Sequence, residues 1–226
     1  MKILYVIPAR GGSKGIPYKN IKQLNGKPLI YYTIDVVREL TTDENICVST
    51  DDEEIIKVVE DYGLKVHFKR PFHLATDTAS TNDVLLHAID YYKTKGVNYD
   101  VIVLLQPTSP LRTSLHIKEA IDLYNEDLEM VVSVKESRAA SVLCSEKENG
   151  FLEFCFNKTG SRRQEMDSFY EYNGAIYVIN VGKLKEKGLS NFIKKKKYLM
   201  DETSSFDIDT PLDWFLVESI IKQKTI

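Results

Sequence analysis

A glycine-rich, cationic loop follows the first apolar run of the chain. Residues 8–20 read PARGGSKGIPYKN, with three glycines, three cations (Arg10, Lys14 and Lys19) and the hydroxyl of Ser13. Glycines allow close backbone approach, and successive N–H groups can cradle anionic oxygens. The order matches neither the P-loop GxxxxGK[ST] nor the GxGxxG of dinucleotide-binding enzymes. We interpret the loop as a triphosphate site of another class. The alternative, a glycine turn with solvated lysines, leaves three cations directly after a buried strand unexplained.

Two aspartates near the C-terminal end form a second candidate site. Residues 207–209 read DID, and in an extended segment Asp207 and Asp209 point to one face while Ile208 packs inward. Mg²⁺ and Mn²⁺ suit one or two carboxylates together with phosphate oxygens. The alternative is that Asp209 caps a helix starting near Pro211. Because a triphosphate loop lies elsewhere in the chain, we interpret the pair as the metal site.

A third candidate, Gln106, follows the most apolar strand of the sequence. Pro107 and Pro110 stiffen the turn after it. An amide both donates and accepts, which suits hydroxyl and N-acyl groups of a sugar, although it could equally bond to the local backbone. Arg112 fits a structural role at a helix start or in a salt bridge.

An arginine pair, Arg162 and Arg163, is the fourth candidate. It could bind a carboxylate through two parallel hydrogen bonds, or it could lie on a solvated face. Its position in an irregular segment a dozen residues before a strand favours the ligand role.

The elements that must position these residues alternate between strand and helix patterns. The expected strands are 3–7, 46–50, 65–68, 100–105, 130–134 and 175–180. The expected helices are 28–40, 52–62, 81–95, 114–125 and one that begins at 210–211. Asp51 or Asp52 should cap the second helix and Gly63 should end it. This order predicts an α/β fold of parallel units with helices on both faces of the sheet.

The pattern changes from about residue 135, where weak alternation predicts an antiparallel insertion or arm within 135–180 of a single domain, 1–226. The inner positions expected for the last helix are Leu212, Phe215, Leu216, Ser219 and Ile220. Ligands of open α/β sheets gather beyond the carboxyl ends of the strands, so the candidate loops lie where a site is expected.

The whole-chain composition excludes several classes of protein. A net charge of −3 argues against nucleic acid as a partner, and no apolar run is long enough for a membrane span. The three cysteines are widely spaced and the histidines show no zinc-ligand spacing, which is typical of a cytoplasmic protein without zinc. The basic run at 194–197 fits a solvated loop or a strand edge.

Seven motifs together resemble the CMP-sialic acid synthetases, or acylneuraminate cytidylyltransferases. They are PARGGSKGIPYKN at 8–20, STD at 49–51, LATDTAS at 74–80, QPTSPLR at 106–112, RRQ at 162–164, NGAIY at 173–177 and DID at 207–209. The resemblance implies a Rossmann-like mixed sheet, transfer of CMP from CTP to an acidic nine-carbon sugar with loss of pyrophosphate, and dependence on Mg²⁺ or Mn²⁺. It also implies a homodimer in which a small antiparallel arm completes the partner's sugar site.

The resemblance also implies roles for individual residues. The nucleotide-binding set is Arg10, Gly11, Gly12, Ser13, Lys14, Lys19, Asn20, Arg70 and Ser80. The sugar-binding set is Gln106, Arg162, Arg163 and Gln164, the last three reaching a sugar site, expected to be the partner's. The catalytic set is Arg10, Lys19, Asp207 and Asp209. The base that takes the sugar's proton stays open between the aspartates and a metal-bound water or hydroxide.

One position departs from the family pattern and leaves the sugar open. Some bacterial members have an arginine two residues before NGAIY, where this chain has Glu171. The alternatives are legionaminic acid, pseudaminic acid, KDN or KDO as the sugar, or a different sugar nucleotidyltransferase. A nucleotide-binding protein without catalysis is disfavoured by the aspartate pair.

Overall fold

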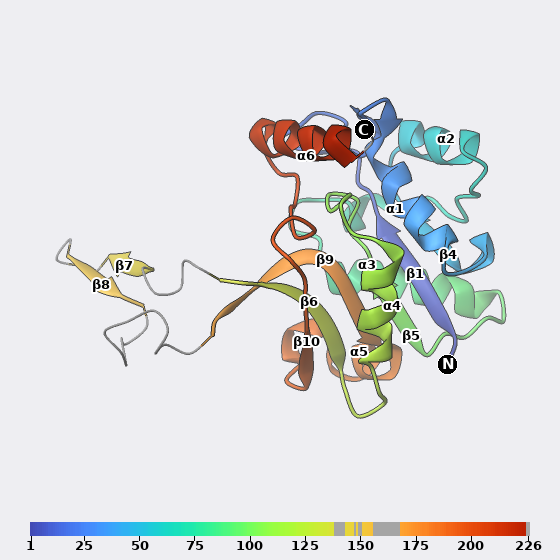
Figure 1. The fold of residues 1–226 in the computed structure, drawn as a ribbon. Coiled ribbons are helices and arrows are strands. Elements are labelled where there is room, and N and C mark those ends of the chain that lie inside the picture. Colours follow the sequence, from blue (N-terminus) through green and yellow to red (C-terminus); the bar gives the residue numbers. More distant parts are fainter. Residues whose placement is uncertain (138–142, 147, 149–150, 156–167, 225–226) are drawn as a thin grey trace.

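A six-stranded mixed sheet forms the centre of the computed structural model, which describes residues 1–137, 143–146, 148, 151–155 and 168–224 (Figure 1). In spatial order the strands are β10 (Lys195–Leu199), β6 (Met130–Glu136), β9 (Tyr170–Asn180), β5 (Val101–Leu104), β1 (Ile3–Pro8) and β4 (Ile46–Ser49). Strand β9 is antiparallel to both its neighbours, and every other pair in this sheet is parallel. The expected mixed, mostly parallel sheet is confirmed.

Helices cover both faces of the sheet because its strands are apolar on both sides. Along β1, Tyr5 and Ile7 pack in one core cluster while Leu4 and Val6 pack in another. The first cluster contains residues of α1 (Leu29–Arg38), α2 (Glu53–Asp61) and α4 (Ser114–Asp122). The second contains residues of α3 (Thr81–Thr94) and α5 (Val181–Lys187).

The predicted boundary signals of α2 are confirmed. Asp52 is the N-cap, and its carboxylate accepts hydrogen bonds from the backbone N–H groups of Glu54 and Ile55. Gly63 follows the helix with a φ of +79°, the left-handed conformation that glycine adopts without strain.

The last helix, α6 (Pro211–Lys224), lies beside the site and shows a different inner face from the one expected. Trp214 and Val217 are buried against Ile16 and Ile208, whereas Phe215 is 65% exposed. Leu212 and Leu216 are exposed as well. The prediction was wrong for these three positions, because α6 carries apolar residues around most of its circumference and spacing alone does not select a face. Ile220 packs against the cluster as expected.

A small antiparallel element lies within the predicted range 135–180. Strands β7 (Cys144–Glu146) and β8 (Leu152–Phe154) pair with each other and extend away from the main sheet (Figure 1). Strand β9, expected in the arm, instead belongs to the central sheet. The long β6–β9 pairing carries the sheet outward toward the arm.

Other elements differ from the sequence-based expectation. Residues 65–68, predicted as a strand, form none, and the chain next to them makes a single parallel bridge between Thr50 and Lys69. Helix α5 and the small hairpin of β2 (Gln23–Leu24) and β3 (Lys27–Pro28) were not expected. Short 3-10 turns lie at Lys19–Ile21, Asp43–Asn45, Phe72–Leu74 and Leu189–Asn191. The lysine-rich run is the edge strand β10, where lysines discourage pairing with another sheet. Within the described ranges, no helix has the length and apolar character to cross a bilayer.

Candidate active site

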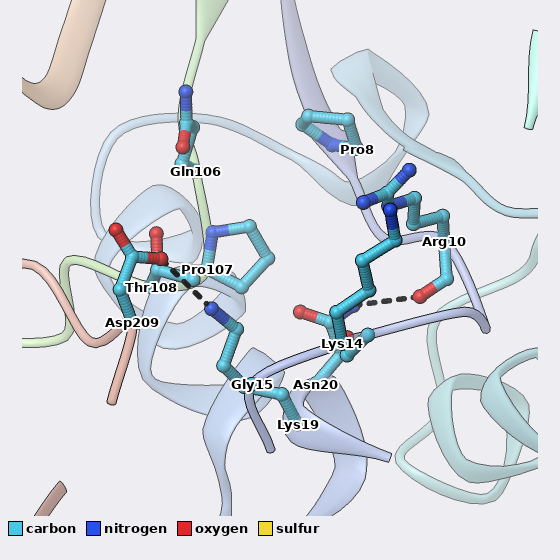
Figure 2. Close-up of a pocket in the computed structure, with 11 residues that line it drawn as sticks. Pro8, Arg10, Lys14, Gly15, Lys19, Asn20, Gln106, Pro107, Thr108 and Asp209 are labelled. Carbon is cyan, nitrogen blue, oxygen red and sulfur yellow. Dashed lines mark hydrogen bonds and ion pairs between the residues drawn. The ribbon is translucent and has the colours of Figure 1, made fainter. Parts of the chain in front are cut away.

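The carboxyl ends of β1, β5 and β6 meet at one edge of the sheet. The loop after β1, Gln106 after β5 and the segment before α6 enclose a cavity of about 300 Å³, here called the loop cavity (Figure 2). Its lining residues are Pro8, Arg10, Ser13, Lys14, Gly15, Lys19, Asn20, Gln106, Pro107, Thr108 and Asp209. Segments distant in the sequence therefore converge where the fold class predicts a ligand site.

Close backbone approach shapes the glycine loop. A Cβ on Gly11 would lie 2.3 Å from the Asp52 carboxylate, and one on Gly15 would lie 2.5 Å from the carbonyl oxygen of Asp209. A Cβ on Gly12 would meet nothing within 4 Å. Asn20 is buried, and its amide donates to the carbonyl of Arg10 at 3.1 Å. Gly15 is thus needed for contact between the loop and the aspartate segment, while Asn20 holds the loop closed.

The three loop cations already have anionic partners. Arg10 and Lys14 both pair with Asp77, at 2.8 and 2.6 Å. Lys19 donates to the carbonyl of Ile208 at 2.7 Å and pairs with Asp209 at 3.1 Å. Hydrogen bonding from Lys14, with help from Arg10, lowers the pKa of Asp77. The cations therefore face carboxylates where the triphosphate is expected.

Asp77 is a site residue that the sequence-based reasoning missed. It lies inside the LATDTAS motif, between the predicted nucleotide residues Arg70 and Ser80. The signal was present, but nothing in the sequence showed that this aspartate faces the glycine loop.

A second cavity, of about 280 Å³, adjoins the first and shares Pro8, Arg10 and Gln106 with it. Arg70 lines it from the inside, donating to the carbonyls of Ser49 at 2.7 Å and Leu74 at 3.3 Å. Burial lowers the pKa of Arg70. Leu74, Val84 and Leu85 supply apolar walls, which suit a flat ring.

Ser80 has a structural task that the motif alone did not reveal. It is the N-cap of α3, and its hydroxyl oxygen accepts from the backbone N–H of Asp83 at 3.1 Å. Its neighbours Ala79 and Thr81 line the second cavity, whereas Ser80 is exposed and does not. The cap sets the start of α3 and so positions that wall.

The middle residue of the aspartate segment packs inward, as predicted. Ile208 is fully buried in the α6 cluster, while Asp209 faces the loop cavity. Helix α6 is capped by other residues: Asp213 accepts from the N–H of Thr210 at 2.7 Å, and the Thr210 hydroxyl accepts from the N–H of Asp213 at 3.3 Å. Asp209 therefore does not cap α6, which was the alternative to its proposed role as a metal ligand.

Asp207 fits a cation ligand. Its Oδ1 is buried without a hydrogen-bond partner among the described residues. Burial raises the pKa of Asp207, and the nearby charge of Asp209 raises it further. A divalent ion would relieve both effects. Because the described residues hold no group of three or more carboxylate, histidine or cysteine ligands, the ion would rely on this pair and on phosphate oxygens.

A third cavity, here called the β9 cavity, measures about 430 Å³ and opens beside Gln106. Its lining residues are Gln106, Lys135, Glu171, Tyr172, Asn173, Gly174, Tyr177, Glu202, Ser205, Phe206, Asp207 and Asp213. The two predicted metal ligands thus line neighbouring cavities, Asp209 the loop cavity and Asp207 the β9 cavity.

Two buried polar side chains hold this part of the site in place. Arg112 is fully buried and donates to the carbonyls of Gln106 at 3.2 Å and Ala175 at 2.7 Å and to the Thr33 hydroxyl at 2.8 Å. Burial lowers its pKa to about 9. Asn173 donates to the Ser205 hydroxyl at 2.9 Å. Arg112 ties the Gln106 turn to β9 and α1, which confirms a structural role, and Asn173 ties β9 to the segment before Asp207.

The predicted sugar-binding residues are only partly accounted for. Gln106 lines all three cavities. Arg162, Arg163 and Gln164 lie outside the described residues. Lys135 and Asn173 line the β9 cavity without having been predicted as site residues.

Comparison with known proteins gives a consistent result. The sequence model of the family described as cytidylyltransferase matches residues 4–178. A post-translational flagellin modification protein B of Campylobacter coli is 32% identical, over 100% of this chain and 97% of its own length. A CMP-N,N'-diacetyllegionaminic acid synthase of Legionella pneumophila is 34% identical, over 98% of this chain and 97% of its own.

An N-acylneuraminate cytidylyltransferase of Escherichia coli is 37% identical over 99% of this chain, but the chain spans only about half, 53%, of that enzyme. Among solved structures, a CMP:2-keto-3-deoxy-manno-octonic acid synthetase complexed with CTP has a TM-score of 0.73 and 18% identity. It covers 99% of this chain and 100% of its own, which shows a common fold.

Proposed function

The chain belongs to the cytidylyltransferase family, and from that premise we propose that it transfers CMP from CTP to an acidic nine-carbon sugar. The anomeric hydroxyl of the sugar attacks the α-phosphorus of CTP and gives its proton to a base. A new P–O bond forms, the bond between the α-phosphorus and the oxygen that bridges it to the β-phosphorus breaks, and pyrophosphate leaves. The observation that carries this proposal is the loop cavity, where three cations and one carboxylate of the Asp207–Asp209 pair line the same space.

The loop cations serve the triphosphate. Positioning and charge neutralisation do most of the work in phosphoryl and nucleotidyl transfer, and Arg10, Lys14 and Lys19 supply both. Their present partners, Asp77 and Asp209, are carboxylates that phosphate oxygens would replace as acceptors. The apolar cavity beside Arg70 would take the cytosine ring.

Asp207 and Asp209 would hold Mg²⁺ or Mn²⁺, which neutralises negative charge on the phosphates when bound. The buried, unpartnered Oδ1 of Asp207 supports this assignment. The β9 cavity would hold the sugar next to it, with Gln106 at the junction of the two substrates.

N-acetylneuraminic acid and legionaminic acid are the sugars we favour, since relatives named for both are 34–37% identical to this chain. Pseudaminic and KDO-type acids are the alternatives for the same reaction.

The direct test mixes purified protein with CTP, Mg²⁺ and a panel of N-acetylneuraminic, legionaminic, pseudaminic and KDO acids, and follows CMP-sugar and pyrophosphate by mass spectrometry. We expect a CMP-sugar from at least one acid and none from the Asp207→Ala/Asp209→Ala variant. No product from any acid, despite CTP binding, would contradict the proposal.

We also propose a homodimer in which Arg162, Arg163 and Gln164 of one subunit reach the sugar site of the other. The outward-pointing β7–β8 pair, which precedes these residues in the sequence, supports it (Figure 1). The test mixes two inactive variants, Arg163→Ala and Asp207→Ala, after measuring the mass of each by light scattering. Mixed dimers would regain activity because one of their two sites has both residues intact. A monomeric protein, or no recovery after subunit exchange, would contradict the arrangement.

A further inference from the structure

The β9 cavity continues into a further cavity at the outer end of β6 and β9. This outer cavity measures about 560 Å³ and shares Lys135, Glu171 and Glu202 with the β9 cavity. Its other lining residues are Glu136, Leu199, Met200 and Asp201. The loop, β9 and outer cavities thus adjoin through shared residues, Gln106 between the first two and Glu171 between the last two, and this series of adjoining cavities is here called the groove.

The outer part of this groove is acidic. Carboxylates of Glu171, Glu202, Asp207 and Asp213 line the β9 cavity. Lys135 is the single cation among the described residues that line the β9 and outer cavities. An anionic substrate would be repelled here unless its own charge lies elsewhere and the part facing the acidic wall carries hydrogen-bond donors.

The chemistry of a 2-ulosonic acid meets that condition. Its carboxylate is attached to the anomeric carbon, so the charge stays beside the hydroxyl that attacks CTP, at the Gln106 end of the groove. The rest of the molecule carries hydroxyl groups and, in N-acylated members, amide N–H groups. These are donors, and ionised carboxylates are pure acceptors.

Glu171 is the carboxylate of this wall that lines both the β9 and the outer cavity and is oriented by two neighbouring side chains. It lies directly opposite Lys135 in the β6–β9 pairing, and its carboxylate lies 3.4 Å from the Lys135 ammonium. The Ser137 hydroxyl donates to its Oε1 at 2.5 Å. Its side chain is still 43% exposed and lines both the β9 and the outer cavity, so it has acceptor capacity left for a ligand. Hydrogen bonding from Ser137 lowers the pKa of Glu171, which keeps it ionised at neutral pH.

We propose that Glu171 is a specificity-determining residue whose carboxylate, oriented by Ser137 and Lys135, accepts a hydrogen bond from an O–H or N–H donor of the sugar acid beyond its anomeric centre. This inference rests on the proposed function and adds the feature by which the enzyme selects its sugar. A site built to bind a donor discriminates strongly against analogues that lack it, because the acceptor is then left unpaired.

The test compares Glu171→Leu and Glu171→Gln with the control Glu126→Leu, an exposed residue in the turn before β6. For the acid that the wild type uses, we expect Glu171→Leu to raise KM by about 10- to 100-fold, the range for loss of a hydrogen bond to a charged group. The KM for CTP and the kcat at saturating acid should stay within about twofold, because the reacting atoms are not touched. Glu171→Gln keeps an acceptor oxygen, so its KM for the acid should rise less than that of Glu171→Leu. This graded result would distinguish a lost hydrogen bond from a general folding defect.

Analogues identify the donor. In each one a single hydroxyl is removed or the amide nitrogen is methylated. With the analogue that lacks the donor bound by Glu171, the KM of the wild type should rise by the same factor as Glu171→Leu raises it for the intact acid. The KM of Glu171→Leu should be the same for this analogue and for the intact acid. A deoxy analogue with this behaviour assigns a hydroxyl, and an N-methyl analogue assigns an amide.

Two results would overturn the inference. One is an unchanged KM for Glu171→Leu, and the other is a further rise in the KM of Glu171→Leu that is equal to that of the wild type on every analogue. If the wild type makes no CMP-sugar from any acid, the proposed function itself fails, and that outcome is separate from both.

Discussion

The two ends of the groove differ in the charges that line them. At the inner end, Arg10, Lys14 and Lys19 gather on one loop around the loop cavity. At the outer end, carboxylates from β9, from the segment before α6 and from α6 itself line the β9 cavity together with Lys135. The cations of the inner end come from a single loop, whereas the charged groups of the outer end come from segments far apart in the chain.

This difference follows from the charges of the two substrates. A triphosphate is a dense anion, so a loop of cations and N–H groups suffices to attract it. A sugar acid carries one charge and several hydroxyl or amide groups, so its recognition requires hydrogen-bond acceptors that are fixed in position. Buried supports such as Arg112 and Asn173 are found on that side, where geometry matters more than net charge.

The largest effect is expected at the junction of the two ends. Asp207→Asn removes one of two proposed metal ligands and should lower kcat about 10³-fold, the scale of losing a main electrostatic contribution in a reaction of this type. Steady-state rates at saturating Mg²⁺ measure it. A decrease of less than tenfold would mean that Asp209 alone holds the ion, so that the metal site belongs to the loop cavity and not to the junction of the two cavities.

The same variant should be more stable than the wild type in metal-free buffer at pH 7. Burial raises the pKa of Asp207, so the folded state binds its proton more tightly than the unfolded state. The ionised carboxylate therefore destabilises the fold above that raised pKa, and the penalty disappears as pH falls toward the value of a free aspartate. The melting temperature of Asp207→Asn should exceed that of the wild type at pH 7, and the gap should narrow at acidic pH.

Lys19→Met tests the inner end. Lys19 is only 14% exposed and bonds the aspartate segment, whereas Lys14 is 77% exposed. We expect Lys19→Met to lower kcat about 10²-fold because a positioned cation is lost from a partly buried site. Lys14→Met is the matched control and should lower it only a few-fold, because exposed charges are screened by solvent. Equal effects would show that the loop acts through its summed charge and not through position.

The contrast between the two ends also explains what the sequence predicts. The glycine loop is contiguous, and the structure brings its predicted residues Arg10, Ser13, Lys14, Lys19 and Asn20 to one cavity. The strands were predicted from apolar runs, because such runs are buried wherever they lie. Asp77 and Lys135 were missed because their place depends on tertiary contacts between distant segments. The face of α6 was wrong for the same reason, since Trp214 contacts residues about 200 positions earlier.

Arg112→Lys tests whether the outer end depends on fixed geometry. A lysine cannot reproduce the fork that bonds Gln106, Ala175 and Thr33. We expect a loss of about 2 kcal/mol in the free energy of unfolding, the scale for losing hydrogen bonds from a charged donor. Denaturant unfolding measures this. The KM for the sugar acid should also rise, while the KM for CTP should change less. If only the KM for CTP rises, the idea that fixed geometry matters mainly at the outer end would be contradicted.

The smallest effect is expected for Asp77→Asn, and its sign decides what the paired loop means. Asp77 pairs with Arg10 and Lys14 and is half exposed. If it competes with the triphosphate, its neutralisation frees two cations, and the KM for CTP should fall about two- to threefold at low ionic strength. The gain should vanish in high salt, because an exposed attraction is screened there. Initial rates at several CTP and salt concentrations measure both. A KM that rises instead would show that Asp77 holds Arg10 and Lys14 in place for the nucleotide, so that fixed geometry would govern the inner end as it does the outer.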